Sequence, residues 1–188
     1  MARRPSPDPF LAALVVIGLI GGTAILLGDD PDRRAPERPL PFGLATDPDR
    51  AALVAVFERE ADRAGLAPEL LMALAWRESR WHQDDVSEDG AVGVGQLIPS
   101  TARFVADDIL AEPHLDPLVV EDNIRLSAAY LAWLLERSGG DLGAALAGYV
   151  QGPRSVRDEG RFGVTDAYVL DVLALRADFA PPIPRTAG

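Results

Sequence analysis

The 188-residue sequence contains no cysteine, no lysine and only two histidines. Without cysteine, the chain can form no disulfide framework, no thiolate nucleophile and no cysteine-ligated metal site. His82 and His114 are too few to favour a histidine-based metal site, so we expect neither a metal nor another cofactor. All 18 basic residues are arginine, which we attribute to genomic base composition rather than to function.

Positive charge is also scarce, and the formal net charge is -11 at pH 7. This charge repels phosphate backbones, so we expect no nucleic-acid partner. The arginines form no cluster in the sequence outside the N-terminus, so we expect any polyanionic partner to be held by hydrogen bonds. Hydrophobic residues make up 48% of the chain, and its length suffices for one domain with a buried core.

One long uncharged run, Phe10–Leu27, follows two arginines near the N-terminus. As a helix it would span roughly 27 Å, close to the roughly 30 Å of a bilayer core. It fits either a membrane anchor or a signal peptide that is cut after Gly22-Thr23-Ala24. We favour the anchor, because the apolar run continues past that cut. Gly18 and Gly22 form a GxxxG pair, which would allow a weak homodimer through the anchor.

The rest of the chain has helical periodicity. Apolar residues at three- and four-residue spacing predict helices at 48–64, 68–80, 100–109, 121–138, 141–150 and 166–178. Glycines and prolines, including Gly152-Pro153, separate these segments, and only "AVGVGQLI" suggests a short extended stretch. We therefore predict an all-α domain and divide the chain into an anchor or signal peptide (1–28), a Pro/Arg-rich linker (29–46), the helical domain (47–180) and a flexible tail (181–188).

The predicted helix "APELLMALAWRESR" carries a carboxylate where its apolar face calls for a core residue. Leu70, Leu71 and Leu74 define that face, and Glu78 is the next position along it. Burial beside Trp76 and Trp81 would raise the pKa of Glu78, so that it could donate a proton near neutral pH. The alternative is a solvated glutamate at the helix end that pairs with a neighbouring arginine.

Two further features make the catalytic interpretation of Glu78 stronger. Glycines in "GAVGVGQLIP" would let a large ligand approach the main chain, and Gln96 adds a hydrogen-bond donor and an acceptor. In "DLGAALAGYVQGP", helical spacing turns Tyr149 inward, where its hydroxyl needs a partner such as a buried Glu. Each feature alone is more common as an ordinary turn or an ordinary core tyrosine.

Four motifs resemble the soluble lytic transglycosylase family in order and in spacing, over about residues 48–178. The run "ESRWHQDDVSEDGAVGVGQLIPSTA" resembles the family's Glu-Ser motif and its following Gly-Leu-Met-Gln-Leu segment. "EDNIRLSAAYLAWLLER" resembles its Asn-Ile…Tyr-Leu helix, "AGYVQGPRSV" its Ala-Tyr-Asn-x-Gly-Pro motif and "TDAYVLDVL" its closing helix. The resemblance implies a lysozyme-like fold that cleaves the β-1,4 bond between N-acetylmuramic acid and N-acetylglucosamine in peptidoglycan.

Residue by residue, the resemblance implies that Glu78 is the catalytic acid and then the base, and that Tyr149 hydrogen-bonds it. It also implies a set of substrate-binding residues: Ser79, Gly93, Gly95, Gln96, Ile98 and Tyr168, the last as a wall of the cleft. The product would be a 1,6-anhydro sugar. The partner would be peptidoglycan strands in the bacterial cell envelope, with the domain anchored on the outer side of the cytoplasmic membrane, or secreted if the signal is cut.

Two positions depart from the family pattern, and two rival functions follow. Val150 replaces an Asn, and Gly95 replaces a Met that could line the sugar site. One rival is a goose-type lysozyme-like hydrolase, in which Asp84, Asp85 or Asp89 would activate water. The other rival is a non-catalytic peptidoglycan-binding module, which would tolerate both departures.

Overall fold

The computed structural model describes residues 48–180, and the part of the chain that it describes is helical. Its helices are α1 (Pro48–Arg63), α2 (Pro68–Ser79), α3 (Pro99–Phe104), α4 (Val120–Arg137), α5 (Leu142–Gln151), α6 (Pro153–Glu159) and α7 (Gly163–Phe179), with a π-helical turn at Val105–Ile109 after α3. Residues 48–180 contain no strand, since the glycine-rich segment forms only isolated bridges from Val92 to Val86 and Leu97. The all-α prediction is confirmed.

Helix α6 is the element that the sequence interpretation missed. Gly152-Pro153 was expected to break the chain, yet Pro153 opens α6. Proline is well suited to the first helical position, where its fixed φ is helical and its missing N–H costs no hydrogen bond. Gly152 makes the change of direction with a φ of 87°. The expected helix at 100–109 also divides, into α3 and the π-helical turn.

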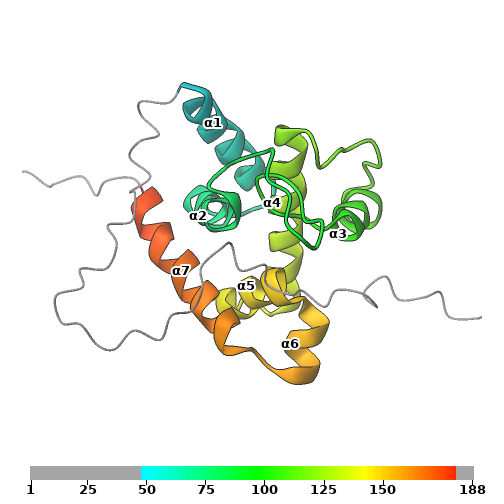
Figure 1. The fold of residues 1–188 in the computed structure, drawn as a ribbon, viewed down its shortest axis with the longest axis vertical. Coiled ribbons are helices and arrows are strands. Elements are labelled where there is room, and N and C mark those ends of the chain that lie inside the picture. Colours follow the sequence, from blue (N-terminus) through cyan, green and yellow to red (C-terminus); the bar gives the residue numbers. More distant parts are fainter. Residues whose placement is uncertain (1–47, 181–188) are drawn as a thin grey trace, which may run out of the picture.

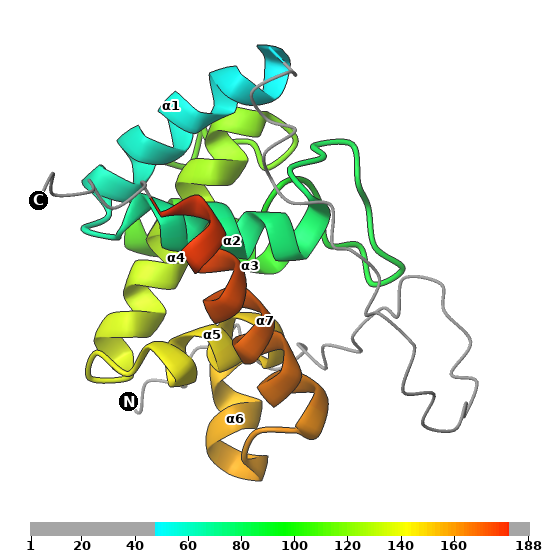
Figure 2. The ribbon, with the colours of Figure 1, turned by 90° about the vertical axis from the view of Figure 1, so that its left-hand side faces the viewer.

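Two helix pairs, α2 with α7 and α1 with α4, form the body of the molecule, and α5 contacts both pairs. Helix α7 lies across α2 (Figure 2), while α4 runs through the molecule and packs against α1 and α5 (Figure 1). Helix α5 also contacts α6 and α7. Fully buried side chains from α1, α2, α4, α5 and α7 fill the space between the helices, among them Phe57, Leu71, Leu74, Ile124, Leu131, Leu146 and Val172. This packing brings the end of α2 beside α7.

No helix within residues 48–180 is both long and apolar enough to cross a membrane. The predicted anchor over Phe10–Leu27, its GxxxG dimer pair, the linker and the tail all lie outside the described residues. The membrane anchor and the division into domains therefore stay predictions.

Asn123, in the first turns of α4, fastens the glycine-rich segment to the core. Its side chain is fully buried, and its Oδ1 accepts a hydrogen bond from the backbone N of Gly95 at 2.8 Å. Its Nδ2 donates to the carbonyl oxygens of Val92 at 3.0 Å and Pro117 at 2.8 Å. One amide therefore satisfies three backbone groups in two different loops, which fixes both loops against α4.

We expect Asn123→Ala to lower the free energy of unfolding by about 1–3 kcal/mol, because it leaves the buried N–H of Gly95 without an acceptor. The carbonyls of Val92 and Pro117 each keep one other donor, Leu97 N and Gln83 Nε2. Urea or thermal unfolding of the full-length chain measures this loss. Glu121→Ala, at an exposed position of the same helix, is the control and should change stability by less than about 0.5 kcal/mol. Equal effects of the two substitutions would contradict this role for Asn123.

Candidate active site

Glu78 lies in the last turn of α2, directly before a sharp reversal of the chain. Arg80 and Trp81 both adopt left-handed backbone conformations, with φ of 55° and 65°. This conformation is strained for residues that carry a Cβ. The backbone N of Arg80 bonds to the carbonyl of Trp76 at 3.0 Å, which ends the helix.

An aromatic cluster holds this strained turn in place. The Trp81 ring, which is 3% exposed, lies 4.6 Å from the Phe57 ring and 5.4 Å from the Phe179 ring, centroid to centroid. Its Nε1 donates to the carbonyl of Met72 at 3.0 Å, and Trp76 packs edge-on against it. The packing of Trp81 therefore offsets the backbone strain and fixes the end of α2, which carries Glu78.

The Glu78 carboxyl is half-buried and has an unusual pKa. Burial raises the pKa of Glu78 to about 7, although Tyr168 and Arg77 act in the opposite direction. The Tyr168 hydroxyl donates a hydrogen bond to Glu78 Oε1. The guanidinium of Arg77 lies 5.3 Å from the Tyr168 ring centroid and bonds to Asp171 at 3.3 Å. The expected rise in the pKa of Glu78 is thus present.

Tyr149 does not make the hydrogen bond that the sequence interpretation assigned to it. Its hydroxyl donates to the carbonyl of Gly95 at 2.8 Å, so the predicted Tyr149–Glu78 hydrogen bond is wrong. Tyr168, expected only as a wall of a cleft, is the true partner, because α7 lies across α2 and places Tyr168 beside the helix end. Tyr149 is still near enough to Glu78 for the carboxylate charge to raise the pKa of the phenol, after the larger effect of burial.

The glycine-rich segment is packed against the protein itself. A Cβ on Gly95 would lie 1.8 Å from the Ser127 hydroxyl and 3.0 Å from the Tyr149 hydroxyl. A Cβ on Gly93 would lie 2.4 Å from the Asn123 amide nitrogen, and φ there is 76°. Because these glycines have no side chain, neighbouring side chains of α4 and α5 can pack against them. The space beside these two glycines is thus filled by the protein itself, and their role in substrate binding stays a prediction.

The other predicted substrate-binding residues fall into two groups. Ser79 is buried, donates to the carbonyl of Val94 at 2.9 Å and accepts from the backbone N of His82 at 3.1 Å. Gln96 and Ile98 are half-buried, and the Gln96 amide donates to the Gly93 carbonyl at 3.1 Å. Ser79 thus ties the segment to α2, whereas Gln96 and Ile98 keep exposed surface that a ligand can reach.

Gln151, at the end of α5, is a structural residue that the sequence interpretation missed. Its Oε1 accepts from the Thr165 hydroxyl at 2.7 Å and from the backbone N of Phe162 at 3.2 Å. Its Nε2 donates to the carbonyl of Gly160 at 2.8 Å. Gln151 therefore fixes the start of α7, one turn before Tyr168. A polar residue beside a Gly-Pro pair was the only signal of this in the sequence.

Among residues 48–180, burial, Tyr168 and Arg77 cause the pKa shift of Glu78, and no second carboxylate is among the causes. Asp84, Asp85 and Asp89 lie in the exposed part of the loop that follows, and Asp85 faces His82 at 3.9 Å. Within the same range, no group of three or more His, Asp and Glu side chains is placed to hold a metal ion. With a pKa of about 7, the Glu78 carboxyl can give up or take a proton near neutral pH.

Comparison with known proteins gives a consistent result. The family model of the transglycosylase SLT domain matches residues 55–163. The peptidoglycan transglycosylase gp16 of Escherichia phage T7 is 37% identical over 109 residues, which cover 57% of this chain and 8% of that protein. The membrane-bound lytic murein transglycosylase F of Maricaulis maris is 40% identical over 82 residues, which cover 44% of this chain and 16% of that protein.

A solved structure extends the comparison to the fold. It is an inactive mutant, with Glu replaced by Gln, of the lytic transglycosylase Slt from Pseudomonas aeruginosa. It superposes with a TM-score of 0.60 at 31% identity and covers 65% of this chain and 23% of that one. The chain thus spans less than a quarter of the length of each of these three proteins.

The two tyrosines can be distinguished by substitution. In Tyr168→Phe the pKa of Glu78 should rise further, because the lost hydrogen bond had stabilised the ionised carboxylate. In Tyr149→Phe the pKa should stay near 7, while the free energy of unfolding should fall by about 1–2 kcal/mol because the Gly95 carbonyl loses its donor. Carboxyl ¹³C NMR titration and urea unfolding measure the two effects. A rise in the pKa of Glu78 in Tyr149→Phe, with no rise in Tyr168→Phe, would instead show that Tyr149 is the partner of Glu78.

Proposed function

Because the chain belongs to the transglycosylase SLT domain family, we propose that it is a peptidoglycan lytic transglycosylase with Glu78 as its single acid and base. The observation that carries this proposal is the Glu78 carboxyl, half-buried with a pKa of about 7 and hydrogen-bonded by Tyr168. The relatives named above are transglycosylases by name. The substrate is the β-1,4 bond between N-acetylmuramic acid and N-acetylglucosamine.

In the first step, the protonated Glu78 donates its proton to the glycosidic oxygen as that bond breaks. A carboxyl group with a pKa near 7 is largely protonated in mildly acidic solution and about half protonated at neutral pH, which an exposed glutamate is not. The substrate's own 2-acetamido oxygen stabilises C1. This replaces the second enzyme carboxylate that most glycosidases use.

In the second step, the ionised Glu78 takes the proton of the C6 hydroxyl, whose oxygen then bonds to C1. The product is a 1,6-anhydro ring, and no water is consumed. Tyr168 and Arg77 stabilise the ionised carboxylate between the two steps, because both lower its pKa. One carboxyl group can therefore serve as the acid and then as the base, provided that its pKa lies near the working pH.

The remaining residues of the site shape it or contact the sugar. Ser79 and Tyr149 hold the glycine-rich segment beside Glu78 through the carbonyls of Val94 and Gly95. Gln96 and Ile98, which keep exposed surface, are the candidates for direct contact with the glycan. An enzyme with this substrate works in the cell envelope, and attachment through Phe10–Leu27 remains the interpretation of the sequence.

Glu78→Gln should reduce cleavage of purified peptidoglycan by at least about 10³-fold, because an amide can neither donate nor accept the proton. Mass spectrometry of the products of the native full-length chain should show anhydro-muropeptides, which are lighter by one water than the hydrolysis products. Reducing ends in their place would establish the goose-type hydrolase. Undiminished cleavage by Glu78→Gln would remove Glu78 from the mechanism, and binding without cleavage by either protein would identify a binding module.

The control for this variant is its stability. The folded-state pKa of Glu78, about 7, lies above the ordinary value of 4.5. The stability that the protonated carboxyl provides is therefore complete below pH 4.5 and is lost as the pH rises through 7. Glu78→Gln should thus be folded and, at pH 8, more stable than the native chain by on the order of 2 kcal/mol. A variant that unfolds would make its loss of activity uninformative, and Glu78→Asp then supplies the test.

The pH dependence of kcat/KM provides a further test. Since the free enzyme must hold the proton on Glu78, kcat/KM should be constant below about pH 6 and should fall tenfold per pH unit above about pH 7. In Tyr168→Phe the descending limb should move to higher pH, because the pKa of Glu78 rises. If the descending limb of the kcat/KM profile does not move in Tyr168→Phe, the group whose titration it reports is not Glu78.

A further inference from the structure

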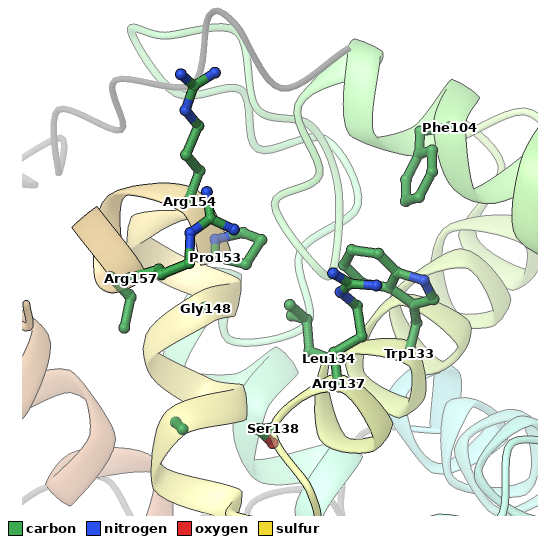
Figure 3. A pocket seen from close by; sticks show the side chains of 11 residues that line it. Phe104, Trp133, Leu134, Arg137, Ser138, Gly148, Pro153, Arg154 and Arg157 are labelled. Atoms are coloured by element: carbon green, nitrogen blue, oxygen red, sulfur yellow. The ribbon is translucent and has the colours of Figure 1, made fainter. Parts of the chain in front are cut away.

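A second concave site lies on the other side of α5, between the C-terminal end of α4 and the short helix α6. It is an open pocket of about 600 Å³, within the size range of small-ligand sites. Trp133 and Arg137 lie on one side of it, on α4, and Arg154 and Arg157 line the other side, on α6, with the Arg154 side chain running away from Trp133 (Figure 3). Gly148 lies at its floor, where a Cβ would come within 3.1 Å of Leu134. We call this site the arginine pocket.

The arginine pocket is positive in a chain that is strongly negative overall. Of the described residues that line it, three are arginines and none is acidic. Arg154 and Arg157 share a single carboxylate, Asp158, at 3.5 Å and 3.0 Å. The Arg137 guanidinium lies over the Trp133 ring, 4.8 Å from its centroid, with its hydrogen-bonding edge available. The pocket therefore carries an excess of positive charge.

This grouping of arginines was not predicted, because Arg137 and Arg154 lie on different helices, with α5 between them. They line the same pocket because α5 packs on α4 and Gly152 turns the chain into α6. The structure thus gathers arginines on this face that are not clustered in the sequence. Guanidinium groups match carboxylates with paired, charge-assisted hydrogen bonds.

The arginine pocket is connected to the candidate active site by a row of aromatic rings. The Tyr149 ring lies 5.3 Å from the Tyr130 ring, which lies 6.0 Å from the Trp133 ring. Phe104 closes the row against Trp133 at 5.3 Å. Tyr149 contacts the glycine-rich segment beside Glu78, so the row runs from that site to the arginine pocket. The row is core packing, since Tyr130 and Tyr149 are buried, and it places the Trp133 wall of the arginine pocket two ring contacts away from Tyr149. A polymer that occupies the Glu78 site is long enough to reach the pocket.

We propose that the arginine pocket binds the free carboxylates of the peptide that the glycan strand carries, while Glu78 acts on a neighbouring bond. This inference rests on the proposed function and adds a preference to it. Peptidoglycan strands bear short acidic peptides on the lactyl groups of their muramic acid units. Strands with free peptide carboxylates then bind more tightly than strands that are amidated or bare.

Binding measured by titration calorimetry tests the proposal, with the full-length chain carrying Glu78→Gln so that the ligand is not consumed. The ligands are a disaccharide tetrapeptide with free carboxyl groups, the same compound with its carboxyl groups amidated, and a neutral N-acetylglucosamine tetrasaccharide. The pocket variant is Arg137→Gln/Arg154→Gln. Its charge-matched control is Arg59→Gln/Arg176→Gln, which removes two arginines that pair with Glu60 and Glu69 elsewhere.

The parent and the control should bind the free-acid ligand about tenfold more tightly than the amidated one, and the pocket variant should lose this difference. Unchanged affinity for the neutral tetrasaccharide shows that the pocket variant is folded. Equal affinity of the parent for both peptides, or an equal loss in the control, would overturn the proposal. If the binding preference for the free acid is found but the native chain cleaves no peptidoglycan, the proposed function alone is refuted. If the native chain cleaves peptidoglycan but no binding preference is found, the role of the arginine pocket alone is refuted.

Discussion

The hydrogen bond from Tyr168 to Glu78 is the contact on which the proposed chemistry depends. Burial alone would favour the neutral acid and make the ionised state costly, which suits only half of an acid–base cycle. A phenol donor and a guanidinium nearby make the ionised state accessible without abolishing the rise in pKa. Because donor and acceptor come from α7 and α2, this balance exists only in the folded chain and depends on how these two helices cross.

The turn that ends α2, directly after Glu78, has a strained backbone. Two consecutive residues, Arg80 and Trp81, are held in left-handed conformations that non-glycine residues rarely adopt. The turn persists because Trp81 is buried between Phe57 and Phe179 and its indole N–H is satisfied. Strain next to a half-buried acid, stabilised by remote aromatic packing, is an arrangement often found where function rather than stability selects the conformation.

Helical periodicity was sufficient to predict the helical class, most helices and the inward direction of Glu78 and Tyr149. Tyr168 was expected only through the family resemblance, as a wall of the cleft. Periodicity could not tell which tyrosine meets the acid, since that depends on the crossing of α2 and α7 rather than on either helix alone. The glycines of the loop were interpreted as space for a ligand. They are instead space for Ser127 and Asn123, because a sequence shows where bulk is missing but not what fills the gap.

Pro153 illustrates a second limit, because the residue that ends one helix also begins the next. The local pattern is the same for a break and for a first helical position, and only the continuation of the chain decides between them. The arginines are a third case. Their charges are separated in the sequence and gather only through tertiary packing, so no local pattern can reveal them.

Gln151 lies directly before the segment that contains α6, and its side chain bonds to Gly160, Phe162 and Thr165, which follow that segment. The stretch from Gln151 to Gly160, which contains α6, is therefore held closed at its base by these hydrogen bonds. Insertions or exchanges within it can alter the arginine-bearing surface and leave the entry of α7, and with it the phenol, undisturbed. Evolution, or an engineer, can thus retarget this face of the molecule independently of the proton-transfer machinery.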